Sequence, residues 1–286
     1  MLPKPKKRIL TWGIAALSLT ALTIWIAWGN SALECNTYTV KSARLPKSFD
    51  GYRIAQVSDL HNAALSEGNQ KLLEMLRQAQ PDMIAITGDL VDSRKLDMDI
   101  ALDFITEAVK IAPCYYVTGN HEARIRQYKT MKKEMKAAGV IVLEDATIPV
   151  TKDGESITLI GMQDPSFHGA YKTSAIEKVV QEQLTQLHRD SGFSIMLFHR
   201  PSYFPMYVSH GVDLVLAGHM HGGQFRLPFV GGLYTPSQGF FPEYDGGLYS
   251  EGNTNMVVSR GIGNSAFPFR INNRPEIVLI ELQTEE

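Results

Sequence analysis

The chain has 286 residues, of which 44% are hydrophobic, and this is enough for one large domain with a substantial core. The formal net charge is -2 and the sequence pI is about 6.5, so bulk charge does not indicate a nucleic-acid-binding protein. The two cysteines do not form a CxxC pair, which excludes a zinc ribbon and a thioredoxin-type motif.

The N-terminus combines a basic segment with a long apolar one. Residues 1–8 carry four positive charges, whereas residues 9–29 carry no charge. A stretch of this length suits a helix that crosses a bilayer, and Trp25 and Trp28 near its end suit the membrane interface. We therefore predict a single-pass transmembrane signal anchor at 9–29 in the cell membrane, with residues 1–8 in the cytoplasm and the rest of the chain outside it.

Two alternatives compete with the retained anchor. A cleaved signal peptide is one, because AWG at 27–29 and NSA at 30–32 each offer a small residue before a possible cleavage site. A buried hydrophobic helix is the other, and the continuous apolarity around the whole helix disfavours it.

Residues 30–50 form a polar linker with a short candidate strand at 37–40, and residues 51–286 form the main domain. Short apolar runs predict strands at 52–58, 82–87, 114–118, 141–143, 157–162, 193–198 and 213–218. Helical spacing of apolar residues predicts helices at 69–79, 98–110, 123–138 and 176–187. This alternation indicates an α/β protein with helices outside a central sheet.

Two further features complete the pattern of elements. A turn at Asp153-Gly154 predicts that a strand at 147–151 pairs with the strand at 157–162. Residues 222–273 are rich in glycine, proline and aromatic residues, and further strands are expected at 256–259 and 276–282.

Five short motifs lie at the ends of predicted strands. They are Asp59-Leu60-His61, Gly88-Asp89, Gly119-Asn120-His121, His199 and Gly218-His219-Met220-His221. The loops after the carboxyl ends of strands are where α/β proteins place functional groups. A single Asp after a strand is usually a turn former or a helix cap. Because alternate residues of an extended segment point the same way, the Asp-x-His and His-x-His pairs can each face one point. Convergence of the five motifs by chance is improbable, so we predict one shared site.

The donor types indicate the kind of ligand at this site. Imidazole mixed with carboxylate suits Zn, Fe or Mn, and the candidates outnumber the four ligands of one tetrahedral zinc. We therefore predict two divalent transition-metal ions, Mn, Fe or Zn, which share one carboxylate.

The motifs resemble the pattern D-x-H, G-D, G-N-H-D/E, H and G-H-x-H of the calcineurin-like metallophosphoesterase family, in the same order over residues 53–223. HGGQ at 221–224 and SRGIGNS at 259–265 further resemble its bacterial YkuE/YaeI-like branch, whose members commonly carry an N-terminal membrane or export segment. Glu122 stands where many relatives have Asp, and we expect little consequence. The resemblance implies a four-layer α/β/β/α sandwich.

The resemblance also implies roles for individual residues. Asp89 would bridge the two ions. The remaining ligands would be Asp59, His61 and His221 for the first ion, and Asn120, His199 and His219 for the second. His121 would bind no metal and would act as the catalytic general acid on the leaving group, or orient the phosphate.

The implied activity is phosphoester hydrolysis, in which a metal-bridging hydroxide attacks phosphorus in line. The anchor favours a phosphodiester or diphosphate substrate near the membrane, including a lipid-linked one. A metal-dependent nuclease, a catalytically silent binding protein on the same fold and a protein phosphatase are the alternatives. The acidic balance disfavours a nucleic-acid partner, and no obligate protein partner is evident.

Several further residues are candidates for the border of the site. The polar ones are Arg124, Arg126, Gln224, Arg260 and Asn264. Eight aromatic residues can form an apolar rim for a lipid, although we expect most of them in the core. They are Phe225, Phe229, Tyr234, Phe240, Phe241, Tyr244, Phe267 and Phe269.

Overall fold

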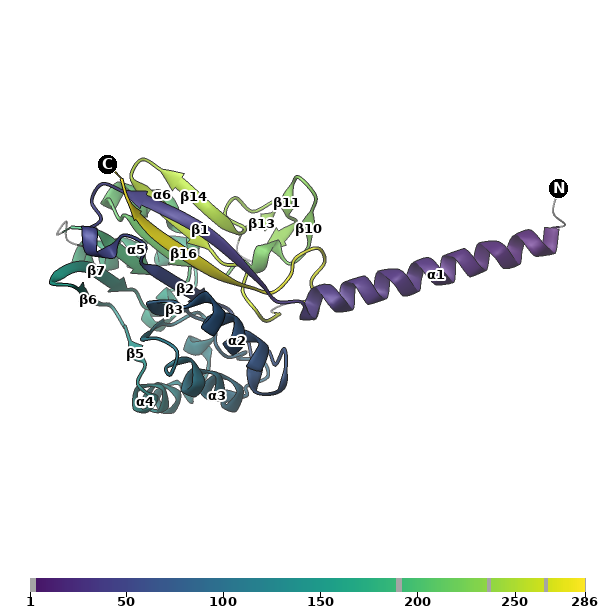
Figure 1. Cartoon of the computed structure of the whole chain (residues 1–286), viewed down its shortest axis with the longest axis horizontal. Coiled ribbons are helices and arrows are strands. Elements are labelled where there is room, and N and C mark those ends of the chain that lie inside the picture. Colours follow the sequence, from purple (N-terminus) through teal and green to yellow (C-terminus); the bar gives the residue numbers. More distant parts are fainter. Residues whose placement is uncertain (1–3, 189–191, 236–237, 265–266, 286) are drawn as a thin grey trace.

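The computed structural model describes residues 4–188, 192–235, 238–264 and 267–285. Its first element, α1 (Lys4–Ser31), is one long helix that projects away from the rest of the molecule (Figure 1). Within the described residues, Arg8–Ser31 is the one helix that is long and apolar enough to cross a membrane, and it is not buried against the domain. A signal peptide meets the same criterion.

The rest of the described chain is organised around two six-stranded sheets. The first sheet has the order β1-β16-β2-β3-β4-β5, and its neighbours run parallel except for β16 and β2. Its strands are β1 (Glu34–Ser42), β2 (Arg53–Val57), β3 (Met83–Thr87), β4 (Cys114–Val117), β5 (Ile141–Val142) and β16 (Glu276–Thr284).

The second sheet has the order β14-β15-β9-β8-β7-β6. Its three inner pairs are parallel and its two outer pairs are antiparallel. Its strands are β6 (Ala146–Lys152), β7 (Glu155–Gly161), β8 (Ser194–Leu197), β9 (Leu214–Ala217), β14 (Gly247–Glu251) and β15 (Thr254–Val258).

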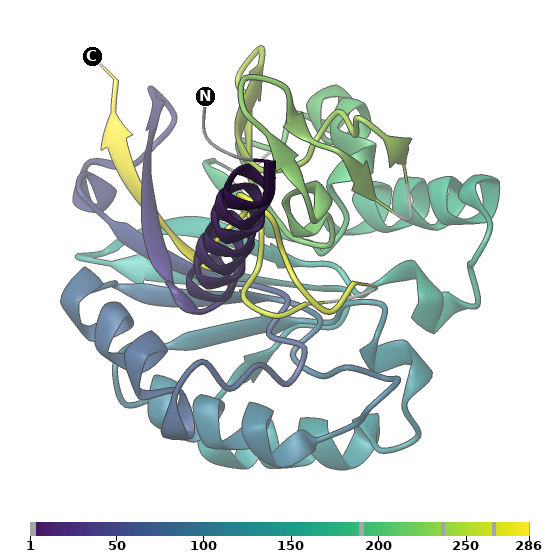
Figure 2. The same cartoon turned by 90° about the vertical axis from the view of Figure 1, so that its right-hand side faces the viewer.

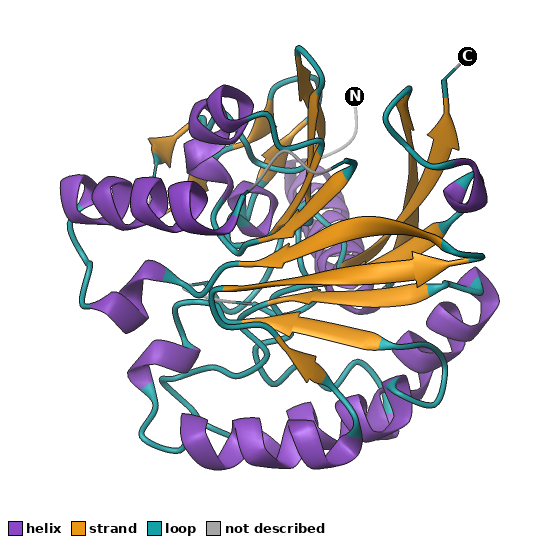
Figure 3. Cartoon of the chain, turned by 90° about the vertical axis from the view of Figure 1, so that its left-hand side faces the viewer, coloured by secondary structure: helices purple, strands orange, loops and turns teal. Residues whose placement is uncertain are grey.

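Helices cover the outer faces of the two sheets (Figure 3). Those on the first sheet are α2 (Gln70–Ala79), α3 (Met98–Ala108) and α4 (Tyr128–Ala138), and those on the second are α5 (Thr173–Leu187) and α6 (Phe204–His210). Three apolar clusters fill the three spaces between these layers. The four-layer α/β/β/α sandwich implied by the sequence is therefore confirmed.

Strand β3 shows why the inner strands are continuously apolar. Ile84 and Ile86 pack in the cluster under the helices, whereas Met83 and Ala85 pack in the cluster between the sheets. Because successive side chains of a strand point to opposite faces, a strand that is covered on both sides needs apolar residues at every position.

Most predicted elements are present, including the antiparallel pairing of β6 and β7 through the turn at Asp153-Gly154. Three differences stand out. The short strand expected at 37–40 within the segment 30–50 is longer than predicted, since β1 runs over Glu34–Ser42. The helix expected from residue 123 begins at Tyr128, after a separate short 3-10 helix (Glu122–Arg124). Helix α6 was not predicted, because its seven residues are too short for a clear helical period.

The segment after the last motif forms two small hairpins, β10 (Arg226–Leu227) with β11 (Gly231–Gly232), and β12 (Tyr234–Thr235) with β13 (Gly239–Phe240). The prediction that most aromatic residues of this region lie in the core is wrong. Five of the eight are exposed, namely Phe229, Phe240, Phe241, Phe267 and Phe269. Strands of two residues are too short to build a sheet face that another layer could cover.

Candidate active site

The five motifs meet at one edge of the sandwich. Strands β2, β3 and β4 of the first sheet and β8 and β9 of the second all end there, each followed by one motif. Several hydrogen bonds join the sheets at this edge. The main-chain N–H of His219 donates to Oδ2 of Asp59 at 3.0 Å, and Nδ1 of His199 lies 2.7 Å from the carbonyl oxygen of Thr87.

The loop backbone is held in an unusual conformation. Asp59, His61, Asp89, His219 and His221 have φ angles of 53°, 44°, 52°, 73° and 48°, all in the left-handed region that non-glycine residues seldom adopt. Tight left-handed turns, and not the expected alternation along an extended segment, therefore orient these side chains. Such strain costs about 1–3 kcal/mol per residue and clusters at functional sites.

Glycines of the motifs allow the loops to approach one another. A Cβ added at Gly218 would lie 2.0 Å from Oγ of Ser58 and 2.3 Å from Oδ2 of Asp59. A Cβ added at Gly119 would lie 2.2 Å from Oδ1 of Asp89. Both glycines therefore leave room for an aspartate of the site.

We expect Gly218→Ala to displace Asp59, because Asp59 and Ser58 occupy the space that the new methyl group needs. Overpacking of this kind costs about 1–3 kcal/mol, and metal affinity should fall with the shift of the carboxylate. Thermal unfolding and metal titration measure the two effects. Gly29→Ala is the control, since its added Cβ meets nothing within 4 Å. Unchanged metal affinity in Gly218→Ala would contradict the packing argument.

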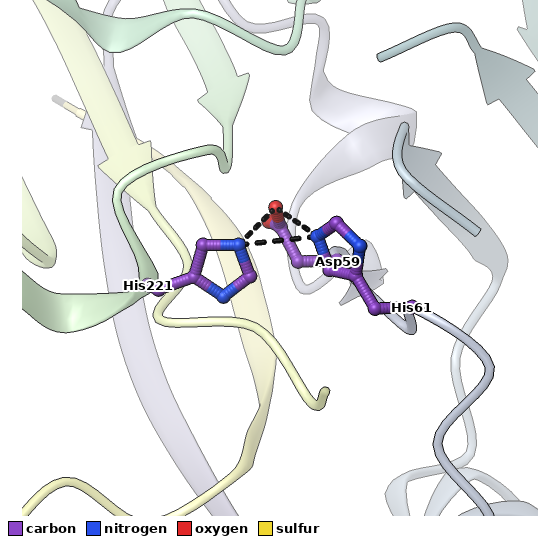
Figure 4. A group of neighbouring side chains, drawn as sticks. All are labelled: Asp59, His61 and His221. Atoms are coloured by element: carbon purple, nitrogen blue, oxygen red, sulfur yellow. Dashed lines mark hydrogen bonds and ion pairs between the residues drawn. The ribbon is translucent and has the colours of Figure 1, made fainter. Parts of the chain in front are cut away.

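One group of candidate ligands consists of Asp59, His61 and His221 (Figure 4). Nε2 of His221 lies 3.2 Å from Oδ1 of Asp59, and Nε2 of His61 lies 3.6 Å from the same oxygen. The two Nε2 atoms are 3.1 Å apart. All three side chains are buried, so three metal-ligating atoms converge on one point away from solvent.

A second group consists of Asp89, His199 and His219. Nε2 of His199 lies 3.2 Å from Oδ2 of Asp89 and 3.2 Å from Nδ1 of His219. Oδ2 of Asp89 is also 3.5 Å from Nε2 of His61, which belongs to the first group. Asp89 therefore adjoins both groups, as a shared ligand would.

The residues present fit the metals that the sequence implies. Oδ1 of Asp59 and Oδ1 of Asn120 are buried, and neither has a hydrogen-bond partner among the described residues. Buried polar oxygens are almost always paired, so two oxygens without a hydrogen bond beside ring nitrogens are suited to ligate a cation. The imidazole and carboxylate donor set suits a transition metal.

The ionisation of these groups suits a metal at the two aspartates and at two of the four histidines. Burial would raise the pKa values of Asp59 and Asp89, but imidazoles of His221 and His199 lower both below the ordinary range. Burial lowers the pKa of His219, and it lowers that of His221 to about 3, so both imidazoles are neutral and have lone pairs to offer. Burial would lower the pKa values of His61 and His199, but the carboxylates of Asp89 and Asp59 raise both, that of His199 to about 10, so these two rings must release a proton when a metal binds.

His121 lies beside the two groups, and its main-chain N–H donates to Oδ1 of Asp89 at 2.8 Å. Its Nδ1 accepts from the main-chain N–H of Ser93 at 3.0 Å and lies 3.4 Å from a carboxylate oxygen of Asp92. In the neutral ring Nδ1 accepts the hydrogen bond from Ser93, and in the protonated ring its N–H is close to the carboxylate of Asp92. In both states Nε2 carries a proton.

A cavity of about 210 Å³ opens over these residues. It is lined by Asp89, Arg94, Asn120, His121, Arg124, His219, Met220, His221, Gln224, Tyr234 and Phe267. Arg124 and Gln224 thus border the site, as expected. Arg126 is not among the lining residues, and Arg260 and Asn264 instead hydrogen-bond to Glu276 and to Arg270, respectively. These three residues are not placed at the cavity.

The profile of the calcineurin-like phosphoesterase family matches residues 52–223, which include all five motifs. The chain belongs to this family. As a metallophosphoesterase it is a hydrolase of phosphoesters. It is 29% identical to "Uncharacterized metallophosphoesterase YkuE" of Bacillus subtilis over 98% of each chain, and 27% identical to "Phosphodiesterase YaeI" of Escherichia coli over 72% of each.

Two other comparisons extend this assignment. "Transmembrane protein with metallophosphoesterase domain" of Danio rerio is 27% identical, over 94% of this chain and 62% of its own. The crystal structure of the protein TT1561 of Thermus thermophilus has a TM-score of 0.50 and 16% identity, and covers 74% of this chain and 90% of that one. This structural likeness shows the fold alone.

The sequence did not predict the part that Glu122 takes in this phosphoesterase. Its buried carboxylate accepts from the main-chain N–H groups of Gly119 at 2.7 Å, Asp89 at 2.9 Å and Val91 at 3.3 Å. Burial raises its pKa to about 7. Glu122 therefore joins the loop after β3 to the loop after β4, and with them Asp89 to Asn120.

We expect Glu122→Ala to lower both stability and metal affinity. It would leave the buried N–H groups of Asp89 and Gly119 unpaired, at about 1–3 kcal/mol each. Glu122→Gln keeps one acceptor oxygen, so its stability and metal affinity should lie between those of the wild type and of Glu122→Ala. Melting temperature and metal dissociation constant measure the effect, and a wild-type melting temperature in Glu122→Ala would contradict the role.

Two arginines outside the motifs support the histidines. Arg200 pairs with the buried carboxylate of Asp164, with Nε 2.6 Å from Oδ2, and so fixes the backbone next to His199. Arg270 is buried and its Nη2 lies 3.4 Å from Nδ1 of His221. Its position 49 residues beyond His221 gives no sequence signal.

Proposed function

We propose that this phosphoesterase hydrolyses a phosphodiester or a diphosphate near a membrane, with two bound divalent ions (Mn, Fe or Zn). The meeting of the two ligand groups at Asp89 is the observation that carries the proposal. Asp59, His61 and His221 would hold one ion, Asn120, His199 and His219 would hold the other, and Asp89 would serve both. When bound, the two ions would supply an activated water and neutralise charge on the phosphate oxygens.

The chain's own side chains would complete the reaction. His121 lines the cavity, and burial lowers its pKa to about 4, so its neutral ring can donate an Nε2–H hydrogen bond that orients a phosphate oxygen. Its protonated form would give a proton to the leaving oxygen and return to the neutral ring. Arg124 lines the same cavity and is exposed, and a guanidinium matches the oxygens of a phosphate bidentately. The buried loops hold these groups in place before substrate arrives.

The preference for a diester rests on the relative named phosphodiesterase, and the membrane location rests on helix α1 and on relatives named transmembrane proteins. The basic residues before the apolar span favour a cytoplasmic N-terminus and an extracytoplasmic domain, under the positive-inside rule.

The test is metal content and turnover of the full chain purified in detergent. Bis-p-nitrophenyl phosphate and p-nitrophenyl phosphate are compared with Mn, Fe, Zn or Mg supplied. We expect about two ions per chain and metal-dependent cleavage with a preference for the diester. A folded protein that binds no transition metal would overturn the proposal. Preferred cleavage of single-stranded DNA would favour a nuclease.

We expect Arg124→Ala to raise KM for the diester, because the substrate loses a charge-assisted hydrogen bond. The loss should be about tenfold, given that hydrogen bonds to charged groups contribute about 1.5–3 kcal/mol. Arg126→Ala is the matched control, since Arg126 is exposed on the same segment but does not line the cavity. Equal KM values for the two variants would contradict a role of Arg124 in substrate binding.

A further inference from the structure

An apolar surface lies beside the catalytic cavity. It consists of six exposed residues, called here the aromatic rim, which are Phe229, Val230, Phe240, Phe241, Phe267 and Phe269. Phe229 is 109% exposed and Phe240 is 70% exposed. The sequence between residues 227 and 241 contains no charged residue. Main-chain hydrogen bonds join the segments of this region, from Leu233 to the carbonyl of Phe225 at 2.7 Å and from Phe241 to the carbonyl of Leu233 at 2.9 Å. Exposed apolar side chains on adjoining segments indicate an interaction surface.

The backbone holds two of these rings outward at a cost. Phe229 and Phe241 have φ angles of 67° and 54°, in the left-handed region that bulky residues seldom occupy. Since both rings remain exposed, no packing in the described structure offsets this strain. A partner that covers the two rings would offset the strain of this backbone.

The rim lies at the end of the domain from which α1 departs. Hairpin strands β10, β11 and β13 are on the side of the domain that faces along α1 in Figure 1, and the loop that follows β15 passes next to the helix in Figure 2. This loop contacts α1 directly, because the side chain of Asn30 donates to the carbonyl of Arg270 at 2.9 Å and accepts from the main-chain N–H of Arg270 at 2.7 Å. Arg270 follows Phe269 of the rim.

Further contacts fix the direction of the helix at this junction. The guanidinium of Arg274 lies 5.0 Å from the ring centroid of Trp28, and its Nε donates to the carbonyl of Ala32 at 2.7 Å. If α1 spans a bilayer, Trp25 and Trp28 mark the interface at the domain side. The rim then lies against that same interface, and the occupant that fits is the bilayer surface.

The rim also joins the cavity. Phe267 and Tyr234 line the cavity wall. The ring centroid of Phe267 lies 5.2 Å from that of Phe225, and the ring centroid of Tyr234 lies 5.2 Å from that of Phe240. An apolar path thus runs from the bilayer side to the candidate metal ligands. A lipid can leave its chains in the bilayer while its phosphate enters between the rim and Arg124.

We infer that the aromatic rim inserts into the bilayer interface and that the substrate is a phosphoester carried by a lipid, taken directly from that interface. This inference rests on the proposed function, since it names the substrate class of the same site. The rim would position the cavity against the headgroups, and it would favour lipid phosphoesters over soluble ones.

Insertion is tested with the full chain in phosphatidylcholine nanodiscs. Phe229→Trp adds a fourth tryptophan to the three of α1, and brominated phosphatidylcholine quenches indoles that enter the bilayer. The matched control is Tyr171→Trp, at a 67% exposed position before α5, which lies at the opposite end of the domain in Figure 1. We expect additional quenching for Phe229→Trp alone. Equal quenching of the two variants would overturn the inference.

The use of a lipid substrate is tested with the triple variant Phe229→Asn, Phe240→Ser and Phe241→Asn. Asparagine is chosen at 229 and 241 because it tolerates the left-handed backbone. Nanodiscs contain phosphatidylglycerol or a polyprenyl diphosphate, and bis-p-nitrophenyl phosphate is the soluble probe. We expect the triple variant to lose about tenfold or more of its lipid-ester hydrolysis, because the apolar contact is lost, and to keep its soluble-ester turnover.

The other outcomes separate the two proposals. Lipid-ester hydrolysis at the wild-type rate in the triple variant, or wild-type protein that cleaves only the soluble ester, would overturn the lipid substrate and leave the proposed function intact. Wild-type protein that cleaves neither class of ester in the presence of metal would overturn the proposed function itself.

Discussion

Asp89→Asn is expected to abolish hydrolysis and to remove both metal ions, the largest effect of any single substitution in this chain. Asp89 adjoins both ligand groups, at 3.2 Å from Nε2 of His199 and 3.5 Å from Nε2 of His61. Even a residue that only supports a ligand changes metal affinity by about 10–100-fold, so the loss of a shared ligand should exceed about 100-fold. Elemental analysis and diester turnover measure the result.

The matched control for this substitution is Asp213→Asn. Asp213 is also a buried aspartate, but it precedes β9 and accepts from the main-chain N–H of Ser194 at the opposite end of the strand. We expect Asp213→Asn to retain its metal and its turnover. Full activity or full metal content in Asp89→Asn would refute the shared-ligand assignment.

His121→Asn is expected to keep both ions and to lose turnover. Its side chain lines the cavity and is held through Nδ1 by Ser93, with Asp92 alongside, so its removal takes away a proton donor and no assigned ligand. General acid catalysis is typically worth about 10²–10⁴-fold, and kcat should fall by that factor. A change in the pH profile of kcat should accompany the loss.

The control for the histidine is His168→Asn, since His168 pairs with Asp145 at the surface, away from the cavity lining. It should match the wild type in metal content and kcat. Metal loss in His121→Asn would assign His121 to the ligand set, and the near group of His61, Asp92 and His121 would then be a metal site.

The sequence was sufficient to predict the candidate ligands because each lies in a short motif at a strand end. Local order along the chain also predicted most strands, since apolar runs such as that of β3 are continuous. It indicated a single central sheet, however, and the two-sheet sandwich was implied by the family resemblance. The supporting residues could not be predicted. Glu122, Arg200 and Arg270 act through contacts that only the folded chain creates, and for Glu122 the expectation from the sequence concerned only the exchange of Asp for Glu.

The error over the aromatic residues has a different cause. A phenylalanine in a sequence is most simply assigned to the core, and that assignment needs a second layer to cover it. The hairpins β10–β13 have no such layer, so composition alone could not separate a core ring from an exposed one.

The pairing of β1 with β16 has a consequence for biogenesis. Glu34, the first residue of β1, is opposite Glu276, so β1, which follows α1 directly, cannot pair until almost the whole chain has been synthesised. Strand β16 lies between β1 and β2, and until it arrives the first sheet has an open edge at β2. Contacts so distant along the chain slow folding and prolong exposure to aggregation. A chain whose synthesis stops before β16 would therefore be left with a first sheet that cannot close, so the last strand completes the fold.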